Sequence, residues 1–153
     1  TNATIKSIKF MTNSMTKAKI NLRIFNKNAK GEPGDDILSY NYIIPINKGK
    51  NINYIELPYE TNTLFPETGI FIAFEFLIIK ENEYLPPRYK DLTGEIIRNK
   101  GKIIAYMPIL GLLESGNPEN SWVFNNGKWY KTQSLYKHKS NKQDIAVELK
   151  LKL

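Results

Sequence analysis

The sequence offers few side chains for covalent or metal chemistry. It has one histidine, His138, and no cysteine. His138 lies in K-H-K-S-N-K, where the neighbouring lysines disfavour its protonation and repel a cation. Thiolate chemistry and disulfides are excluded, and any catalytic triad would depend on His138 alone. We therefore predict no catalytic residue and no metal ligand, and interpret the chain as a non-enzyme.

One carboxylate stands out because of its surroundings. Glu75 interrupts the apolar run Ile70–Ile79, and Arg23 interrupts the strand-like segment Ala18–Phe25. A buried charge without a partner costs roughly 3–5 kcal/mol, so we predict a buried Arg23–Glu75 ion pair across adjacent strands. The alternative is that Glu75 is one of two catalytic carboxylates of a glycosidase.

The first long loop carries the other acidic cluster. The loop contains Glu32, Asp35 and Asp36. Gly31 precedes Glu32, and Gly34 precedes Asp35. Oxygen-rich loops at sandwich edges can bind Ca²⁺, but two adjacent carboxylates point in divergent directions. The segment favours a turn, and we predict no cofactor, with calcium near Asp35 and Asp36 as the alternative.

Aromatic residues flank an Asn-Gly turn near the carboxyl end. Trp122, Trp129 and Tyr130 surround it, and Asn125 supplies an amide. If the rings are exposed and coplanar, they form a sugar-stacking platform, and we name these four residues as the candidate ligand site. If the tryptophans are buried, they are core residues, as large aromatics usually are.

The net charge of +7 gives little indication of a partner. The lysines are spread along the chain, which is typical of solvated surfaces, and no RNA-binding signature accompanies them. The longest apolar stretch, Ile70–Ile79, is too short to span a membrane. We expect neither nucleic-acid binding nor a membrane span.

Period-two alternation predicts strands through most of the chain. Ala18, Ile20, Leu22 and Ile24 share one face, and Ile145 begins a similar series that runs to the last residue. In that final series the odd-numbered residues face inward and Ala146 faces outward. The other expected strands are Thr4–Met11 with a bulge, Leu38–Ile44 ending near Pro45, Asn51–Leu57, and Ile70–Ile79 as the central strand.

Turn chemistry separates these segments. Asn126 and Gly127 favour a type I′ turn between two strands. Lys80–Lys102 is a long excursion with two prolines and at most one short helix, and its Tyr84, Arg88 and Tyr89 form a second candidate surface. The pattern predicts an all-β fold, an antiparallel β-sandwich of about eight strands over residues 1–153.

The order of landmarks resembles a known kind of module. They are I-K-S-I-K-F, N-L-R-I-F-N, G-E-P-G-D-D-I-L, I-E-L-P, G-I-F-I-A-F-E-F-L, Y-M-P-I-L-G and S-W-V-F-N-N-G-K-W-Y. The chain resembles a jelly-roll-like module of exported, cell-surface proteins of Bacteroidota, often found after a carboxypeptidase-regulatory-like, transthyretin-like segment. The resemblance implies a jelly-roll architecture and an extracellular or cell-envelope location, and it supplies no catalytic residues.

These observations favour a non-catalytic surface module. We expect one β-sandwich domain, excised from a longer protein, that binds a glycan or a surface protein or spaces the other domains of its parent chain. The alternative is an accessory fragment of a glycan-active or peptidase-type surface enzyme. The two differ in geometry, because an enzyme needs a cleft with convergent polar groups and a binding module needs an accessible aromatic surface.

Overall fold

Two small antiparallel sheets form the body of the molecule. The computed structural model describes residues 3–57, 65–114, 121–132 and 143–152. In the first sheet, β1 (Thr4–Ser14) lies at the centre, with β5 (Gly49–Glu56) on one side. β16 (Val147–Lys152) and the short β11 (Ile109–Leu110) share its other side.

The second sheet is built around β2 (Ala18–Lys27). β6 (Ile70–Phe76) pairs with one side of it, and β4 (Tyr42–Ile46) and β3 (Pro33–Asp36) share the other. The prediction that Ile70–Ile79 is the central strand is therefore wrong. Within the described residues β6 pairs only with β2, and β2 is the strand with neighbours on both sides.

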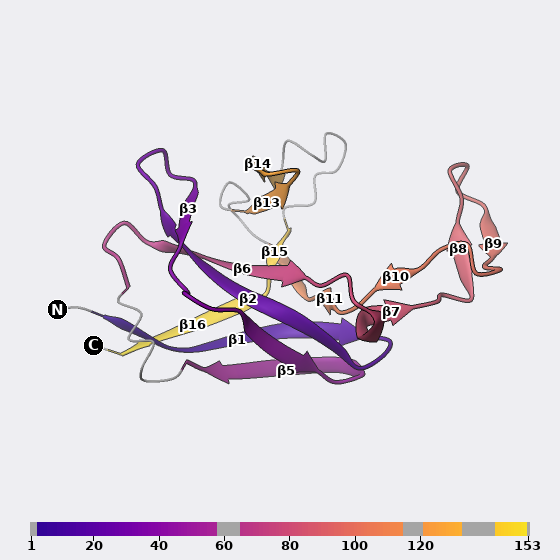
Figure 1. Cartoon of the computed structure of the whole chain (residues 1–153), viewed down its shortest axis with the longest axis horizontal. Coiled ribbons are helices and arrows are strands. Elements are labelled where there is room, and N and C mark those ends of the chain that lie inside the picture. Colours follow the sequence, from indigo (N-terminus) through magenta and orange to yellow (C-terminus); the bar gives the residue numbers. More distant parts are fainter. Residues whose placement is uncertain (1–2, 58–64, 115–120, 133–142, 153) are drawn as a thin grey trace.

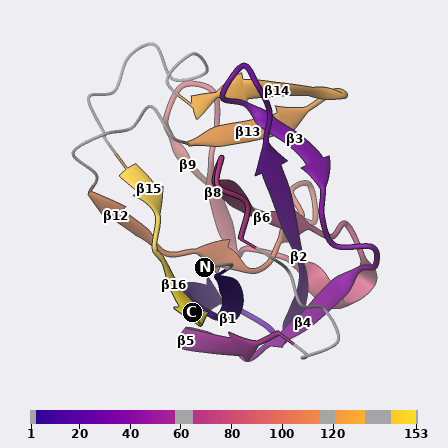
Figure 2. The ribbon, with the colours of Figure 1, turned by 90° about the vertical axis from the view of Figure 1, so that its left-hand side faces the viewer.

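The two sheets pack face to face, as Figures 1 and 2 show. The alternation in β2 predicts its buried face correctly, since Ala18, Ile20, Leu22 and Ile24 are all buried. Phe10 of β1 meets Phe74 of β6 across the interior with ring centroids 4.5 Å apart. The other buried apolar residues of this core are Ile5, Ile8, Leu38, Ile44, Ile46, Ile55 and Met107. The predicted class, an all-β antiparallel sandwich, is confirmed.

Short ribbons complete the fold. They are β7 (Glu83–Tyr84) with β10 (Ala105–Tyr106), β8 (Arg88–Lys90) with β9 (Ile96–Arg98), β12 (Leu112–Glu114) with β15 (Gln143–Ile145), and β13 (Trp122–Asn125) with β14 (Lys128–Lys131). The described residues hold sixteen strand segments, more than the eight expected, because many have only two to four residues.

Two local predictions are confirmed. The register of β1 against β16 shifts between Ile5 and Ser7, which is the expected bulge, and it lets both Ile5 and Ile8 face the core. Asn126 and Gly127 both have positive φ, 49° and 79°, as a type I′ turn between β13 and β14 requires.

Two other strand predictions need correction. Pro45 does not end the third strand but lies within β4, opposite Lys19, and among the described residues this strand pairs only with β2. The final strand is broken at Ala146, which is buried although the alternation placed it outward. The chain changes partner there, from β12 to β1, and the Ala146 N–H donates to the Gly111 carbonyl (2.9 Å).

The predicted excursion Lys80–Lys102 is an ordered arm. It starts at a short 3₁₀ helix, Lys80–Asn82, consistent with the one short helix expected there. It continues through β7 to the β8–β9 hairpin and returns through β10. Figure 1 shows this hairpin projecting well away from the two sheets. Throughout the part of the chain that is described, no helix is long and apolar enough to cross a membrane.

Candidate functional site

Arg23 is the centre of a polar network beside β2. Arg23 Nε lies 2.5 Å from Asp36 Oδ2, and Arg23 Nη1 lies 3.8 Å from Glu75 Oε2. The predicted Arg23–Glu75 contact between adjacent strands is thus present, but Asp36 is the closer partner. The prediction that the pair is buried fails at Glu75, whose side chain is 53% exposed. Because this carboxylate is more than half exposed, its contact with Arg23 contributes little to stability.

Two asparagines that the sequence did not single out extend this network. Asn21 is fully buried, and its Nδ2 donates to Glu75 Oε2 (2.7 Å) and to Asn41 Oδ1 (3.2 Å). Arg23 Nη1 also donates to Asn41 Oδ1 (3.2 Å). Asn21 Oδ1 has no partner among the described residues. The signal for Asn21 was its position on the polar face of β2, between the basic residues 19 and 23.

The acidic loop is used for structure. Asp36 directs one oxygen to Arg23 and accepts the Leu38 N–H at the other (2.9 Å), while Asp35 is exposed. Over the described ranges, no group of three or more His, Cys, Asp or Glu side chains is placed to hold a metal ion. The arrangement does not direct Asp35 and Asp36 toward a common centre, as a calcium site would require.

The four residues of the predicted aromatic platform do not share a face. Trp122 pairs with Lys131 and Trp129 with Phe124, so both indoles lie on one side of the β13–β14 hairpin. Asn125 and Tyr130 lie on the other side, because strand residues alternate between faces. A platform of all four residues is therefore excluded.

The tryptophans pack against the second sheet. Trp129 contacts Phe25 of β2 edge-to-face, with centroids 5.1 Å apart and an angle of 80°. Trp122 contacts Phe71 of β6 in the same way at 6.4 Å and 83°. Both indoles are only partly exposed, so they serve mainly to hold the hairpin on the sheet. His138 lies outside the described residues.

A shallow groove lies between β4 and β5. Its volume is about 590 Å³, within the range of small-molecule sites. Three tyrosines line it, Tyr40, Tyr42 and Tyr54, and Glu56 is the one carboxylate among the described lining residues. Figure 2 shows β4 and β5 side by side at one flank of the sandwich, where the two sheets approach each other.

Tyr42 lines this groove and bridges the two sheets. Its hydroxyl donates to the Glu56 carbonyl (3.3 Å), which joins the edge of one sheet to the edge of the other. Burial raises the pKa of Tyr42, and the neighbouring Tyr40 raises it further. The Tyr40 and Tyr42 rings lie 6.2 Å apart at an angle of 41°. Tyr42 therefore stays a neutral hydrogen-bonding phenol, while Tyr40 and Tyr54 present exposed ring surface beside it.

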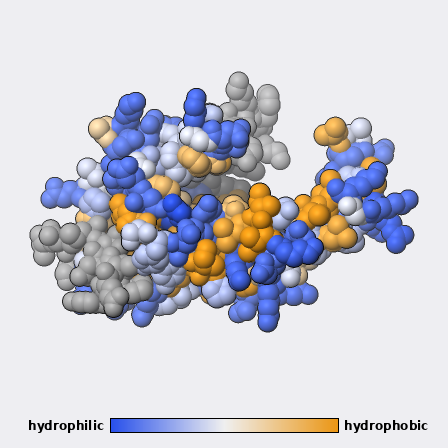
Figure 3. All heavy atoms as spheres, in the orientation of Figure 1, coloured by the Kyte–Doolittle hydropathy of each residue, from blue (hydrophilic) through white to orange (hydrophobic). Residues whose placement is uncertain are grey.

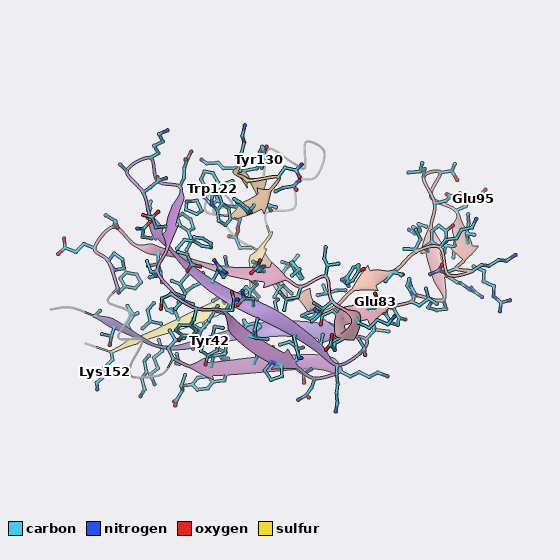
Figure 4. The ribbon with its side chains drawn as sticks, in the orientation of Figure 1. Tyr42, Glu83, Glu95, Trp122, Tyr130 and Lys152 are labelled. Carbon is cyan, nitrogen blue, oxygen red and sulfur yellow. The ribbon has the colours of Figure 1, made fainter. Side chains whose placement is uncertain are left out.

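The groove was missed in the sequence because its two walls belong to different sheets. Figure 4 shows Tyr42 within the sandwich body, well separated from Trp122 and Tyr130. The pattern Y-N-Y at 40–42 and the outward position of Tyr54 were visible, but only the packing of β4 near β5 brings them together.

Compared with protein-family models, with curated proteins and with solved structures, the chain matches none of them.

Proposed function

We propose that this domain is a non-catalytic binding module and that the β4–β5 groove binds a carbohydrate. One observation carries the proposal. Tyr40, Tyr54 and Glu56 are exposed and line the same groove. The C–H face of a pyranose packs on aromatic rings, while its hydroxyls bond to amide and carboxylate oxygens.

The edge of β4 argues for a sugar rather than an added peptide strand. The backbone N–H and C=O of Lys19 both bond to the Asn82 side chain, so they point away from β4. Lys19 and its partner Pro45 therefore form a non-hydrogen-bonded pair, and Pro45 directs its backbone outward. Because proline has no N–H, it removes a donor from the very edge that a peptide strand would need.

The described lining of the groove holds fewer carboxyl groups than a glycosidase uses. Hydrolysis of a glycosidic bond uses two carboxyl groups about 5–10 Å apart. Among the described lining residues Glu56 is the single carboxylate. One carboxylate and three tyrosines support binding of a sugar without its hydrolysis. The resemblance to exported Bacteroidota modules adds a cell-surface location to this proposal.

A glycan array followed by calorimetry tests the proposal. Tyr40→Ala and Tyr54→Ala should each weaken the best glycan at least about tenfold, since tenfold corresponds to 1.4 kcal/mol of lost contact. Tyr130→Ala is the matched control, because Tyr130 is 37% exposed against 40% for Tyr40 but lies on the hairpin. The proposal fails if no glycan binds, or if Tyr130→Ala weakens binding as much as the two groove variants.

A further inference from the structure

The arm carries a cationic face. In the β8–β9 hairpin, Arg88 lies directly opposite Arg98, and Lys90 lies opposite Ile96 on the same face. All three basic residues are exposed, and within the described chain no acidic side chain forms an ion pair with any of them. Like charges directly opposite on paired strands are destabilising, so this face favours an anionic partner.

The tip of the arm exposes one leucine among polar and acidic residues, and hydrogen bonds hold its turn in a fixed conformation. Leu92 is fully exposed in the turn that joins β8 to β9. Asp91 Oδ1 accepts the N–H groups of Thr93 and Glu95 (2.9 Å each) and the Thr93 hydroxyl (2.7 Å). The Asp91 N–H in turn donates to the Glu95 carbonyl (2.9 Å). The turn thus presents a leucine to solvent without needing to rearrange.

The base of the β8–β9 hairpin is anchored by hydrogen bonds of Asn99. Asn99 Nδ2 donates to the carbonyls of Pro86 (2.8 Å) and Ile103 (2.7 Å), and its Oδ1 accepts the N–H groups of Lys102 and Ile103. One side chain therefore fastens the hairpin to both connecting segments. In Figure 3 the outer end of the arm is mostly hydrophilic with an apolar cap, and apolar surface reappears near its base.

We infer that the arm docks on an anionic phospholipid surface, with Leu92 entering the interface and Arg88, Lys90 and Arg98 contacting the headgroups. Residues 85–104 carry five basic and two acidic side chains, for a net charge of +3. An exposed leucine beside basic residues suits a bilayer, where the leucine meets acyl chains and the basic side chains meet phosphates. A nucleic acid would use the charges, but it accepts a leucine only between unstacked bases, at a cost of about a few kcal/mol per step.

The absence of cysteine makes a site-specific test direct. Leu92→Cys is labelled with an environment-sensitive fluorophore and mixed with vesicles of phosphatidylcholine, with or without phosphatidylglycerol. Emission should rise and shift to the blue with the anionic vesicles only. Ile52→Cys, at a position 65% exposed on β5, is the labelled control and should not respond.

A charge comparison tests the headgroup contacts. One basic side chain near an anionic surface contributes about fivefold to partitioning, so Arg88→Gln with Arg98→Gln should lower it about 25-fold. Lys150→Gln with Lys152→Gln removes the same charge from β16, and Figure 4 shows Lys152 at the opposite end of the molecule from Glu95 of the arm. This control should change partitioning less than about threefold, because salt screens distant charges.

Three results would overturn the inference. The first is cosedimentation with anionic vesicles while the label at position 92 stays unchanged. The second is tighter binding to heparin or DNA than to the vesicles at the same salt concentration, which would assign the cationic face to another polyanion. The third is a label response that grows with protein concentration in the absence of vesicles, which would assign the tip to a second copy of the chain.

Discussion

Asn82 is the residue whose loss should most affect the attachment of the arm. It is fully buried at the end of the 3₁₀ helix, just where the pairing of β6 with β2 has finished at Phe76. Its Oδ1 accepts the Lys19 N–H (2.7 Å), and its Nδ2 donates to the carbonyls of Lys19 (2.8 Å) and Leu77 (2.9 Å). The side chain therefore replaces the missing strand as the next partner of β2.

The expected cost of Asn82→Ala follows from these three contacts. The substitution leaves three backbone groups without partners in a buried site, and each costs about 1–3 kcal/mol. Some water entry lowers the sum, so we expect a loss of about 3–5 kcal/mol in the free energy of unfolding. That is a large part of the roughly 5–15 kcal/mol typical of a domain.

Urea denaturation followed by tryptophan fluorescence measures this loss. Asn99→Ala is the matched control, since Asn99 makes four side-chain hydrogen bonds but is only half-buried, so water can replace them. We expect about 1 kcal/mol for it. If Asn82→Ala costs no more than Asn99→Ala, the argument from burial is refuted.

A second variant keeps the test usable if Asn82→Ala does not fold. Asn82→Asp keeps an acceptor for the Lys19 N–H but turns a carboxylate oxygen toward two carbonyls. Burial and these carbonyls raise the pKa of the new carboxyl, and its neutral form can donate one hydrogen bond. The variant should therefore gain stability as the pH is lowered through that pKa, whereas wild type should show no such gain from this site.

Three further predictions use the same denaturation assay. Gly111→Ala should lower the free energy of unfolding by about 1–3 kcal/mol, because the new Cβ would lie 2.6 Å from Met11 Cβ. The backbone cannot move away easily, since the Gly111 N–H donates to the Met11 carbonyl (2.8 Å). A neutral effect would contradict this close contact. Gly127→Ala should lower the free energy of unfolding by about 1 kcal/mol from its positive φ alone, since the new Cβ would meet no atom within 4 Å. Gly127→Asn should cost less, because asparagine adopts positive φ more readily. Equal costs for the two variants would argue against the turn geometry. Because the pKa of Tyr42 is raised from 10.0, its neutral form contributes stability below pH 10 that is lost as the pH rises through the folded-state pKa. Tyr42→Phe should flatten this alkaline decline, and an unchanged profile would show that another group causes it.

The alternation of residues predicted the centre of the fold but misjudged β6. In β2, a strict apolar series with polar residues between them identifies a strand with one core face, and the structure agrees. In β6, apolar residues on both faces suggested a central strand. Phe74 does meet Phe10 inside, but Phe71 faces Trp122 of the hairpin outside. An apolar pattern on both faces of a strand indicates that both faces are covered. It does not indicate whether the strand is paired on one side or on both.

The candidate sites were less predictable than the strands, for a related reason. Arg23 and Glu75 could be paired because each interrupts an apolar pattern on its own strand. The groove depends on Tyr54 of one sheet lying near Tyr42 of the other, and no local pattern records that distance. The sequence predicts a loop where the structure has the arm, because the strands of the arm have only two or three residues, too few for alternation to be seen.

Several accessory elements attach to β2, either at its outward-facing side chains or at backbone groups beyond the end of β6. The backbone of Lys19 is bonded to Asn82 at the root of the arm, the Arg23 side chain holds Asp36 of β3, and Phe25 packs on Trp129 of the hairpin. Each accessory element thus has its own contact at a different position along one strand, whose inner face is fixed by the core.

The groove tyrosines are not among these contacts. Substitutions at Tyr40 or Tyr54 should therefore change groove binding without moving the arm, and substitutions on the arm should leave the groove intact, so that the two surfaces can be tested separately in one protein.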